Sequence, residues 1–122
     1  MRWRQTVPIL RIFDLEKAKQ FYLDFLSFQI EWEHRFQDDL PLYMQIARNG
    51  CILHLTEHHG DCCPGAAVRI GVEDAKSLHT ELLQKQYRYA RPGYQSDWNE
   101  VTVTDPFGNR LHFYTIRDEE EA

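Results

Sequence analysis

Ile52-Leu53-His54-Leu55-Thr56 is followed later in the chain by a similar segment, Arg110-Leu111-His112-Phe113-Tyr114. In both segments an apolar residue stands on either side of the histidine, so that every second residue is apolar, as in a strand with one buried face. Apolar segments at residues 6–13 and 66–72 also open the two halves of the chain. Because similar segments recur in the same order, we expect two copies of one structural unit.

The first half predicts a strand, a helix and three further strands. The helix has an apolar stripe at spacings of three and four residues, formed by Ala18, Phe21, Tyr22, Phe25 and Leu26. Asp14 is a suitable N-cap. The later strands are expected at residues 28–34, which should be half-buried, at 42–48 and at 51–57. Asn49-Gly50 predicts a hairpin turn between the last two.

The second half predicts the same order with a weaker pattern. A strand at 66–72 precedes a helix capped by Asp74, whose stripe is Ala75, Leu78 and Leu82. Proline and glycine limit residues 87–94 to a short or edge strand, and clearer strands follow at 98–104 and 110–116. We therefore predict an α+β fold with module 1 at about 5–57, a linker at 58–64, module 2 at about 65–116 and an acidic, solvated tail at 117–122.

Strand alternation predicts which side chains face away from the helices. Leu53 and Leu55 should lie on the helix side, as should Leu111 and Phe113, which leaves His54 and His112 on the opposite face. Arg11 and Arg69 should share that face. A curved sheet that encloses a ligand would explain these polar groups, whereas the simpler alternative is that both histidines fill the wall and bond to neighbours.

Composition limits the classes of function. A chain of 122 residues with 43% hydrophobic and 27% charged content is ordinary for one globular domain. The net charge of -5 argues against nucleic acid as a partner. No apolar run reaches the roughly 18 residues that a membrane span needs. Three cysteines, two of them adjacent, suit a reducing compartment, so we expect a cytoplasmic protein.

Two motifs carry a family resemblance that extends from residue 7 to residue 116. Phe13-Asp14-Leu15-Glu16-Lys17-Ala18-Lys19-Gln20-Phe21-Tyr22 follows the first strand, and Asp105-Pro106-Phe107-Gly108-Asn109 precedes the last one. Together with the duplicated strand order, these motifs resemble the vicinal oxygen chelate superfamily, which includes glyoxalase I, extradiol dioxygenases, fosfomycin-resistance enzymes and bleomycin-resistance proteins. The resemblance implies two βαβββ modules that form a curved mixed sheet with helices on its outer face.

The resemblance also indicates where metal ligands should stand. Metal-dependent members place a His or Gln seven residues before each helix cap, but here Val7 and Ala67 occupy those positions. The closing-strand positions are His54 and His112, so at most two of four ligands remain. Catalytic zinc sites generally use three protein ligands. This favours a metal-free protein, and the alternative is a lyase, isomerase or dioxygenase that uses a divalent ion such as Zn, Ni, Mn or Fe.

The bleomycin-resistance branch binds its drug without transforming it, in a crevice between two subunits. The resemblance to that branch implies a homodimer that binds or sequesters a small molecule in a concave pocket, with no nucleic acid or membrane partner. The candidate ligand-binding residues are His54, His112, Arg11, Arg69, Trp98, Glu100 and Tyr114, with no catalytic residue and no metal ligand unless His54 and His112 hold one. Ser96-Asp97-Trp98-Asn99-Glu100 is shorter than the matching segment of bleomycin-resistance proteins.

The linker gathers further potential metal ligands, namely His58, His59, Asp61, Cys62 and Cys63. Adjacent Cys-Cys and His-His pairs lack the separations of two to four residues that let ligands wrap around a tetrahedral zinc ion. We therefore expect no zinc site here. A nucleophilic Cys62 or Cys63 is an alternative, although no orienting third group can be named.

Overall fold

The order strand, helix, three strands occurs twice in the structure. The computed structural model describes residues 1–35, 37–85 and 91–117. Its first module comprises β1 (Ile9–Arg11), α1 (Leu15–Lys19), the π-helix η1 (Gln20–Phe25), β2 (Gln29–His34), β3 (Tyr43–Arg48) and β4 (Cys51–Thr56). The second comprises β5 (Ala67–Val72), α2 (Ala75–Gln84), β6 (Gly93–Gln95), β7 (Glu100–Thr104) and β8 (Arg110–Thr115). The first residues of the edge strand expected at 87–94, and most of the acidic tail, lie outside the described residues.

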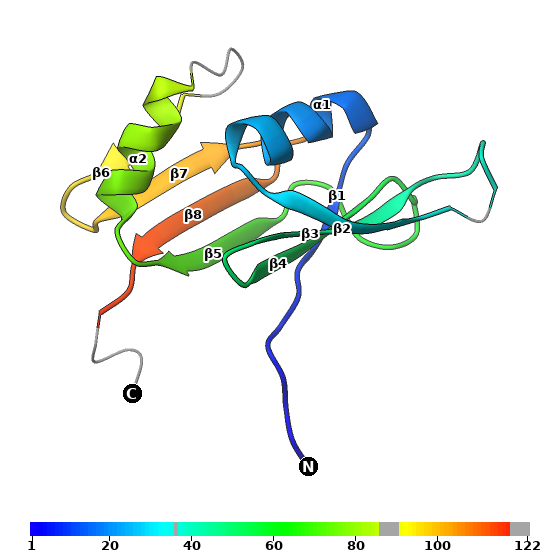
Figure 1. The fold of residues 1–122 in the computed structure, drawn as a ribbon, viewed down its shortest axis with the longest axis horizontal. Helices are drawn as coiled ribbons and strands as arrows, with labels where there is room; N and C mark the ends of the chain where they lie inside the picture. Colours follow the sequence, from blue (N-terminus) through cyan, green and yellow to red (C-terminus); the bar gives the residue numbers. More distant parts are fainter. Residues whose placement is uncertain (36, 86–90, 118–122) are drawn as a thin grey trace.

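The strands form two four-stranded sheets, ordered β1-β4-β3-β2 and β5-β8-β7-β6. In each sheet the opening strand pairs in parallel with the closing strand, so that Leu10 lies opposite Leu55 and Val68 lies opposite Leu111. Both helices lie on one side of the strands in the view of Figure 1. The α+β class is confirmed, and the predicted mixed sheet consists of two separately hydrogen-bonded halves.

One hydrophobic core is shared by the two modules. Leu53, Leu55, Leu111 and Phe113 are all buried in it, as strand alternation predicts. His54 and His112 alternate with these residues along β4 and β8 and are only partly buried. The two histidines therefore lie on the faces turned away from the core.

The predicted apolar stripe of the first helix is buried, but the segment is not a regular α-helix throughout. Asp14 caps it by accepting a hydrogen bond from the Lys17 N–H. After α1 the chain widens into η1, where the Leu26 N–H donates to the carbonyl of Phe21, five residues earlier. The wider turn lets the adjacent pair Phe21 and Tyr22 and the later Phe25 all face the core.

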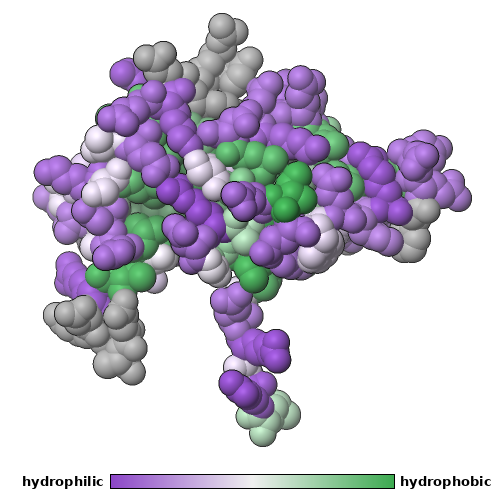
Figure 2. Space-filling model, in the orientation of Figure 1, coloured by the Kyte–Doolittle hydropathy of each residue, from purple (hydrophilic) through white to green (hydrophobic). Residues whose placement is uncertain are grey.

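Several strands differ from their predictions in extent or in burial. The first was expected from residue 6, but only Ile9–Arg11 pairs with β4; residues 1–6 are exposed, and the N-terminal segment projects from the body in Figure 1 and Figure 2. A bulge between Ile30 and Trp32 interrupts the alternation of β2, so the half-buried strand predicted there is largely exposed. β7 begins at Glu100 because Asn99 adopts a positive φ of 47° in the preceding turn.

The two sequence motifs meet inside the molecule. Tyr22 Oη donates a hydrogen bond to Asp105 Oδ2 across 2.6 Å, and Asp105 is 4% exposed. The buried Asn109 side chain donates from Nδ2 to Asp105 Oδ2 at 2.8 Å and to the Arg11 carbonyl at 2.9 Å. This network joins the turn before β8 to both β1 and η1, so the motifs fix the position of one module against the other.

Among the described helices, none is long and apolar enough to cross a membrane.

Candidate functional site

His54 lies in a chain of polar contacts on the face of the first sheet that is turned away from the core. Tyr43 Oη is 2.7 Å from His54 Nδ1, and Gln45 Oε1 is 2.8 Å from His54 Nε2. Gln45 Nε2 in turn donates to Glu31 Oε1 at 2.7 Å. Antiparallel pairing of β3 with β4 places Gln45 directly opposite His54, which is why the two side chains meet.

These contacts define the protonation of the ring. The Gln45 amide nitrogen faces the Glu31 carboxylate, so the amide oxygen faces His54 and can only accept a hydrogen bond. His54 Nε2 therefore carries the hydrogen, and Nδ1 accepts one from the Tyr43 hydroxyl. Burial lowers the pKa of His54. Burial also raises the pKa of Tyr43, and the charge of Asp61 makes a smaller contribution to that increase. Both groups are accordingly neutral at pH 7.

An aromatic surface adjoins this chain. The rings of Trp32 and Tyr43 are stacked with centres 5.9 Å apart and an interplanar angle of 9°. Both rings meet the His54 imidazole edge to face, at 5.3 Å and 5.2 Å between centres. Trp32 remains 42% exposed, so the first sheet presents an aromatic surface near the Glu31 carboxylate.

The second sheet brings together four of the predicted residues. Arg69 lies opposite His112 in the parallel pair of β5 and β8. Its Nε is 3.6 Å from Glu100 Oε1, and its guanidinium carbon lies 4.3 Å from the centre of the Tyr114 ring. The His112 Nδ1 is 2.9 Å from Thr102 Oγ1. These side chains form a mixed charged and aromatic surface on the face away from the core.

For the remaining two predicted residues, the contacts found among the described residues include none with these groups. Trp98 is 70% exposed in the turn before β7. Arg11 is only 9% exposed, because its guanidinium lies 4.5 Å from the centre of the Phe13 ring and donates to the Glu57 carbonyl at 2.5 Å. Within the described part of the chain, the contacts of His54 and those of His112 involve different residues, each set confined to its own sheet.

The donor set does not fit a resident metal ion. Val7 precedes β1 and Ala67 begins β5, and neither side chain can bind a metal. Both ring nitrogens of His54 are engaged by Tyr43 and Gln45. Across residues 1–35, 37–85 and 91–117, no three His, Cys, Asp or Glu side chains gather closely enough to hold an ion.

The linker cluster is organised around a turn. Thr56 Oγ1 donates to Asp61 Oδ2 at 2.7 Å, and His58 Nδ1 is 3.4 Å from Asp61 Oδ1. Cys62 and Cys63 are both free thiols, and burial raises the pKa of Cys62. The zinc interpretation of this segment has no support from these contacts, and the higher pKa disfavours the reactive thiolate form.

A cleft of about 750 Å³ lies elsewhere, between the two modules on the side of α2. It is bounded by the β3–β4 hairpin, the end of η1, the end of β5, the first turns of α2 and the end of β8. None of the seven residues predicted from the sequence lines it.

Comparison with models of known families shows the family of this chain. A family model described as a glyoxalase superfamily protein matches residues 1–120, almost the whole chain. The chain belongs to the glyoxalase superfamily. No curated protein matches its sequence.

Solved structures of superfamily proteins share the fold. A bleomycin-binding protein from bleomycin-producing Streptomyces verticillus, complexed with copper(II)-bleomycin, has a TM-score of 0.70 and 25% identity over 96% of this chain and 99% of that chain. A glyoxalase/bleomycin resistance protein from Streptomyces sp. CB03234 has a TM-score of 0.69 and 19% identity, covering 89% of this chain and 97% of that chain. The trypanothione-dependent glyoxalase I of Leishmania major has a TM-score of 0.68 and 20% identity, covering 98% and 88%.

Sequence reasoning missed Gln45 and Glu31, which orient His54 in this glyoxalase superfamily member. Strand alternation offered a signal, because Tyr43 and Gln45 are two residues apart on a strand expected to pair with residues 51–57. No such signal pointed to Glu31, because the bulge before Trp32 changes which residues of β2 share a face.

Proposed function

We propose that this protein binds a small drug-like or metabolite ligand without a resident metal and without transforming it. The observation that carries the proposal is the state of His54, whose two ring nitrogens are both engaged by Tyr43 and Gln45. A neutral imidazole held in this way has no free lone pair for a metal ion, but it fixes the surrounding side chains as a preformed binding surface.

The surface chemistry favours a ligand with aromatic rings and a positive charge. Trp32 and Tyr43 offer a stacked pair of rings next to the carboxylate of Glu31. On the other sheet, Tyr114 and the Arg69–Glu100 pair offer a second ring and a second carboxylate. Trp98, exposed in the turn two residues before Glu100, would contact the ligand from outside these two groups. Rings bind flat ligands by stacking, and carboxylates attract cations. Two of the similar solved structures are described as bleomycin-binding proteins, so bleomycin is a reasonable probe.

We expect two copies of the chain to complete the site. The His54 and His112 groups lie on different sheets, and each is open on the face away from the core. Ile9, beside His54, is 39% exposed, and Trp32 is similarly exposed. A homodimer would place the first sheet of one copy against the second sheet of the other and enclose both groups in one crevice. The three free cysteines suit a reducing cytoplasm, where such a protein could confer drug resistance.

Tryptophan fluorescence tests ligand binding directly. Trp32 lies on the proposed surface and Trp98 in the turn before Glu100, whereas Trp3 lies in the exposed N-terminal segment. In a Trp3→Phe background, metal-free bleomycin should quench the fluorescence saturably, near one site per subunit. Removal of either remaining tryptophan should lower the amplitude without abolishing it. Glu31→Gln should weaken binding about two- to fivefold, as expected for the loss of one exposed charge pair.

Glu16→Gln is the matched control, because Glu16 is an exposed carboxylate on α1, outside both groups. This variant should bind as the parent does. A flat titration of the Trp3→Phe protein would contradict the proposal for bleomycin, and equal weakening by Glu16→Gln and Glu31→Gln would contradict the proposed position of the ligand.

A further inference from the structure

The cleft between the modules has the size and lining of a second ligand site. Its volume of about 750 Å³ lies within the range of roughly 300–1,000 Å³ that is usual for small-molecule pockets. Its apolar lining comes from both modules and includes Leu26, Phe28, Ile70, Leu78 and Phe113. The aromatic groups around His54 and His112 do not reach it.

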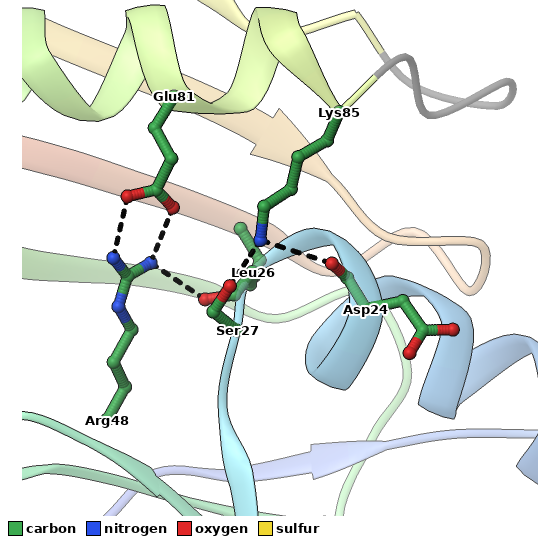
Figure 3. A network of polar contacts seen from close by, with 6 residues as sticks. All are labelled: Asp24, Leu26, Ser27, Arg48, Glu81 and Lys85. Atoms are coloured by element: carbon green, nitrogen blue, oxygen red, sulfur yellow. Dashed lines mark hydrogen bonds and ion pairs between the residues drawn. The ribbon is translucent and has the colours of Figure 1, made fainter.

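Polar contacts between the modules hold the walls of this cleft in place. Arg48 from the β3–β4 hairpin forms two hydrogen bonds with the Glu81 carboxylate of α2, at 2.9 Å and 3.0 Å, and a third with the Leu26 carbonyl at 2.8 Å (Figure 3). Lys85, at the end of α2, donates to the Asp24 carbonyl at 3.2 Å and to the Ser27 hydroxyl (Figure 3). The cleft is therefore preformed, which lowers the ordering cost of binding.

The charge at the cleft is negative once these pairs are counted. Arg48 is neutralised by Glu81, and both side chains line the cleft. Glu73 and Asp74 also line it, and the described contacts of the chain include no hydrogen bond or ion pair of the Glu73 carboxylate. The N-terminus of α2 does not offset this charge, because Asp74 already accepts the N–H groups of Lys76 and Ser77.

We propose that this cleft is a second binding site, separate from the aromatic surface, for a small amphipathic cation. The apolar body of the ligand would lie against the partly exposed Val72, Leu78 and Ile116, with its ammonium group directed to Glu73 at the rim. An anion of the same shape would meet uncompensated carboxylates and bind more weakly.

Matched naphthalene compounds test the charge preference. Calorimetry at low salt should show that 1-naphthylmethylammonium binds about two- to fivefold more tightly than neutral 1-naphthylmethanol, as expected for one or two exposed charge contacts. Glu73→Lys should abolish or reverse that preference. Glu16→Lys introduces the same charge change on the exposed side of α1 and should preserve it.

Chemical modification of Cys51 tests the position of the site. Cys51 lines the cleft and is partly buried, whereas Cys62 and Cys63 lie in the linker. In a Cys62→Ser, Cys63→Ser background, N-phenylmaleimide attached to Cys51 should occupy the cleft and abolish binding of both naphthalene compounds. Unchanged binding after modification, equal affinity for cation and neutral compound, or loss of the preference in Glu16→Lys would each overturn the proposal.

Discussion

His54 is a residue whose chemistry follows from its neighbours. The Gln45 oxygen and the Tyr43 hydroxyl favour the neutral ring, and burial lowers its pKa below 6.5. In the unfolded chain His54 has an ordinary pKa, so as the pH falls it takes up a proton at a higher pH than in the folded protein. The stability that the neutral His54 ring contributes is therefore complete above about pH 6.5 and is lost as pH falls through the lower folded-state pKa.

We expect the free energy of unfolding of His54→Gln to approach that of the parent as the pH is lowered. The variant lacks the titrating ring but keeps a polar side chain of similar reach. Nitrogen NMR of the imidazoles should show a His54 midpoint below 6.5 and a proton on Nε2. A midpoint at or above 6.5 would show that the described contacts do not determine the state of this ring.

The hydrogen bond between Tyr22 and Asp105 can be tested in the same way, because it is buried and joins the two family motifs. Tyr22→Phe should lower the free energy of unfolding by about 1.5–3 kcal/mol, the usual effect of losing a hydrogen bond to a charged group. Tyr94→Phe is the matched control, since its hydroxyl donates to Asn99 in an exposed contact. Equal effects of the two substitutions in urea denaturation would contradict a special role for the buried network.

At the level of single residues, only part of the candidate site was predictable from the sequence. Alternation along β4 and β8 placed His54 and His112 correctly on the sheet faces turned away from the core. The burial of Arg11 against Phe13 was not predictable, because it depends on where the chain turns after β1. The bond from Asn109 to the Arg11 carbonyl likewise joins residues far apart in sequence, and no local pattern reports such a contact.

The β3–β4 hairpin is an element whose turn chemistry can be tested by itself. Asn49 and Gly50 both have positive φ values, 49° and 85°. A Cβ added to Gly50 would meet no atom within 4 Å, so any cost of Gly50→Ala is conformational. We expect a loss of about 1–2 kcal/mol in the free energy of unfolding, measured by thermal or urea denaturation.

Gly60→Ala provides the control for the hairpin. Its Cβ would make only ordinary contacts, 3.7 Å from the His58 ring, and its backbone does not lie in the left-handed region. This substitution should be neutral or stabilise the protein by up to about 1 kcal/mol. A loss at Gly60 as large as that at Gly50 would show that the positive φ is not what makes the hairpin glycine necessary.

Element types were predictable, whereas some of their internal geometry was not. The Asp14 and Asp74 caps, the Asn49-Gly50 turn and the duplicated strand order all rest on local signals that the structure confirms. The π-helix at Gln20–Phe25 accompanies the burial of three of its aromatic side chains, and the bulge in β2 is a register shift in its pairing with β3. Local patterns cannot report such adjustments, because the partner surfaces come from distant parts of the chain.

At the scale of the whole molecule, the fold separates two surfaces with different chemistry. The sheet faces turned away from the core carry the histidines and the rings of Trp32, Tyr43 and Tyr114, while the cleft between the modules is lined by both apolar and acidic side chains. Membership of the glyoxalase superfamily explains the architecture but assigns no ligand, because one fold supports many activities. The proposed function therefore depends on the state of His54 and its neighbours.

Binding of metal-free bleomycin to tag-free protein in excess chelator tests the central claim most directly. Calorimetry should show saturation near one molecule per subunit, with an affinity that chelator does not change. The claim would be contradicted if binding occurred only with a divalent ion that is present at one per subunit in the purified protein and is lost in His54→Ala.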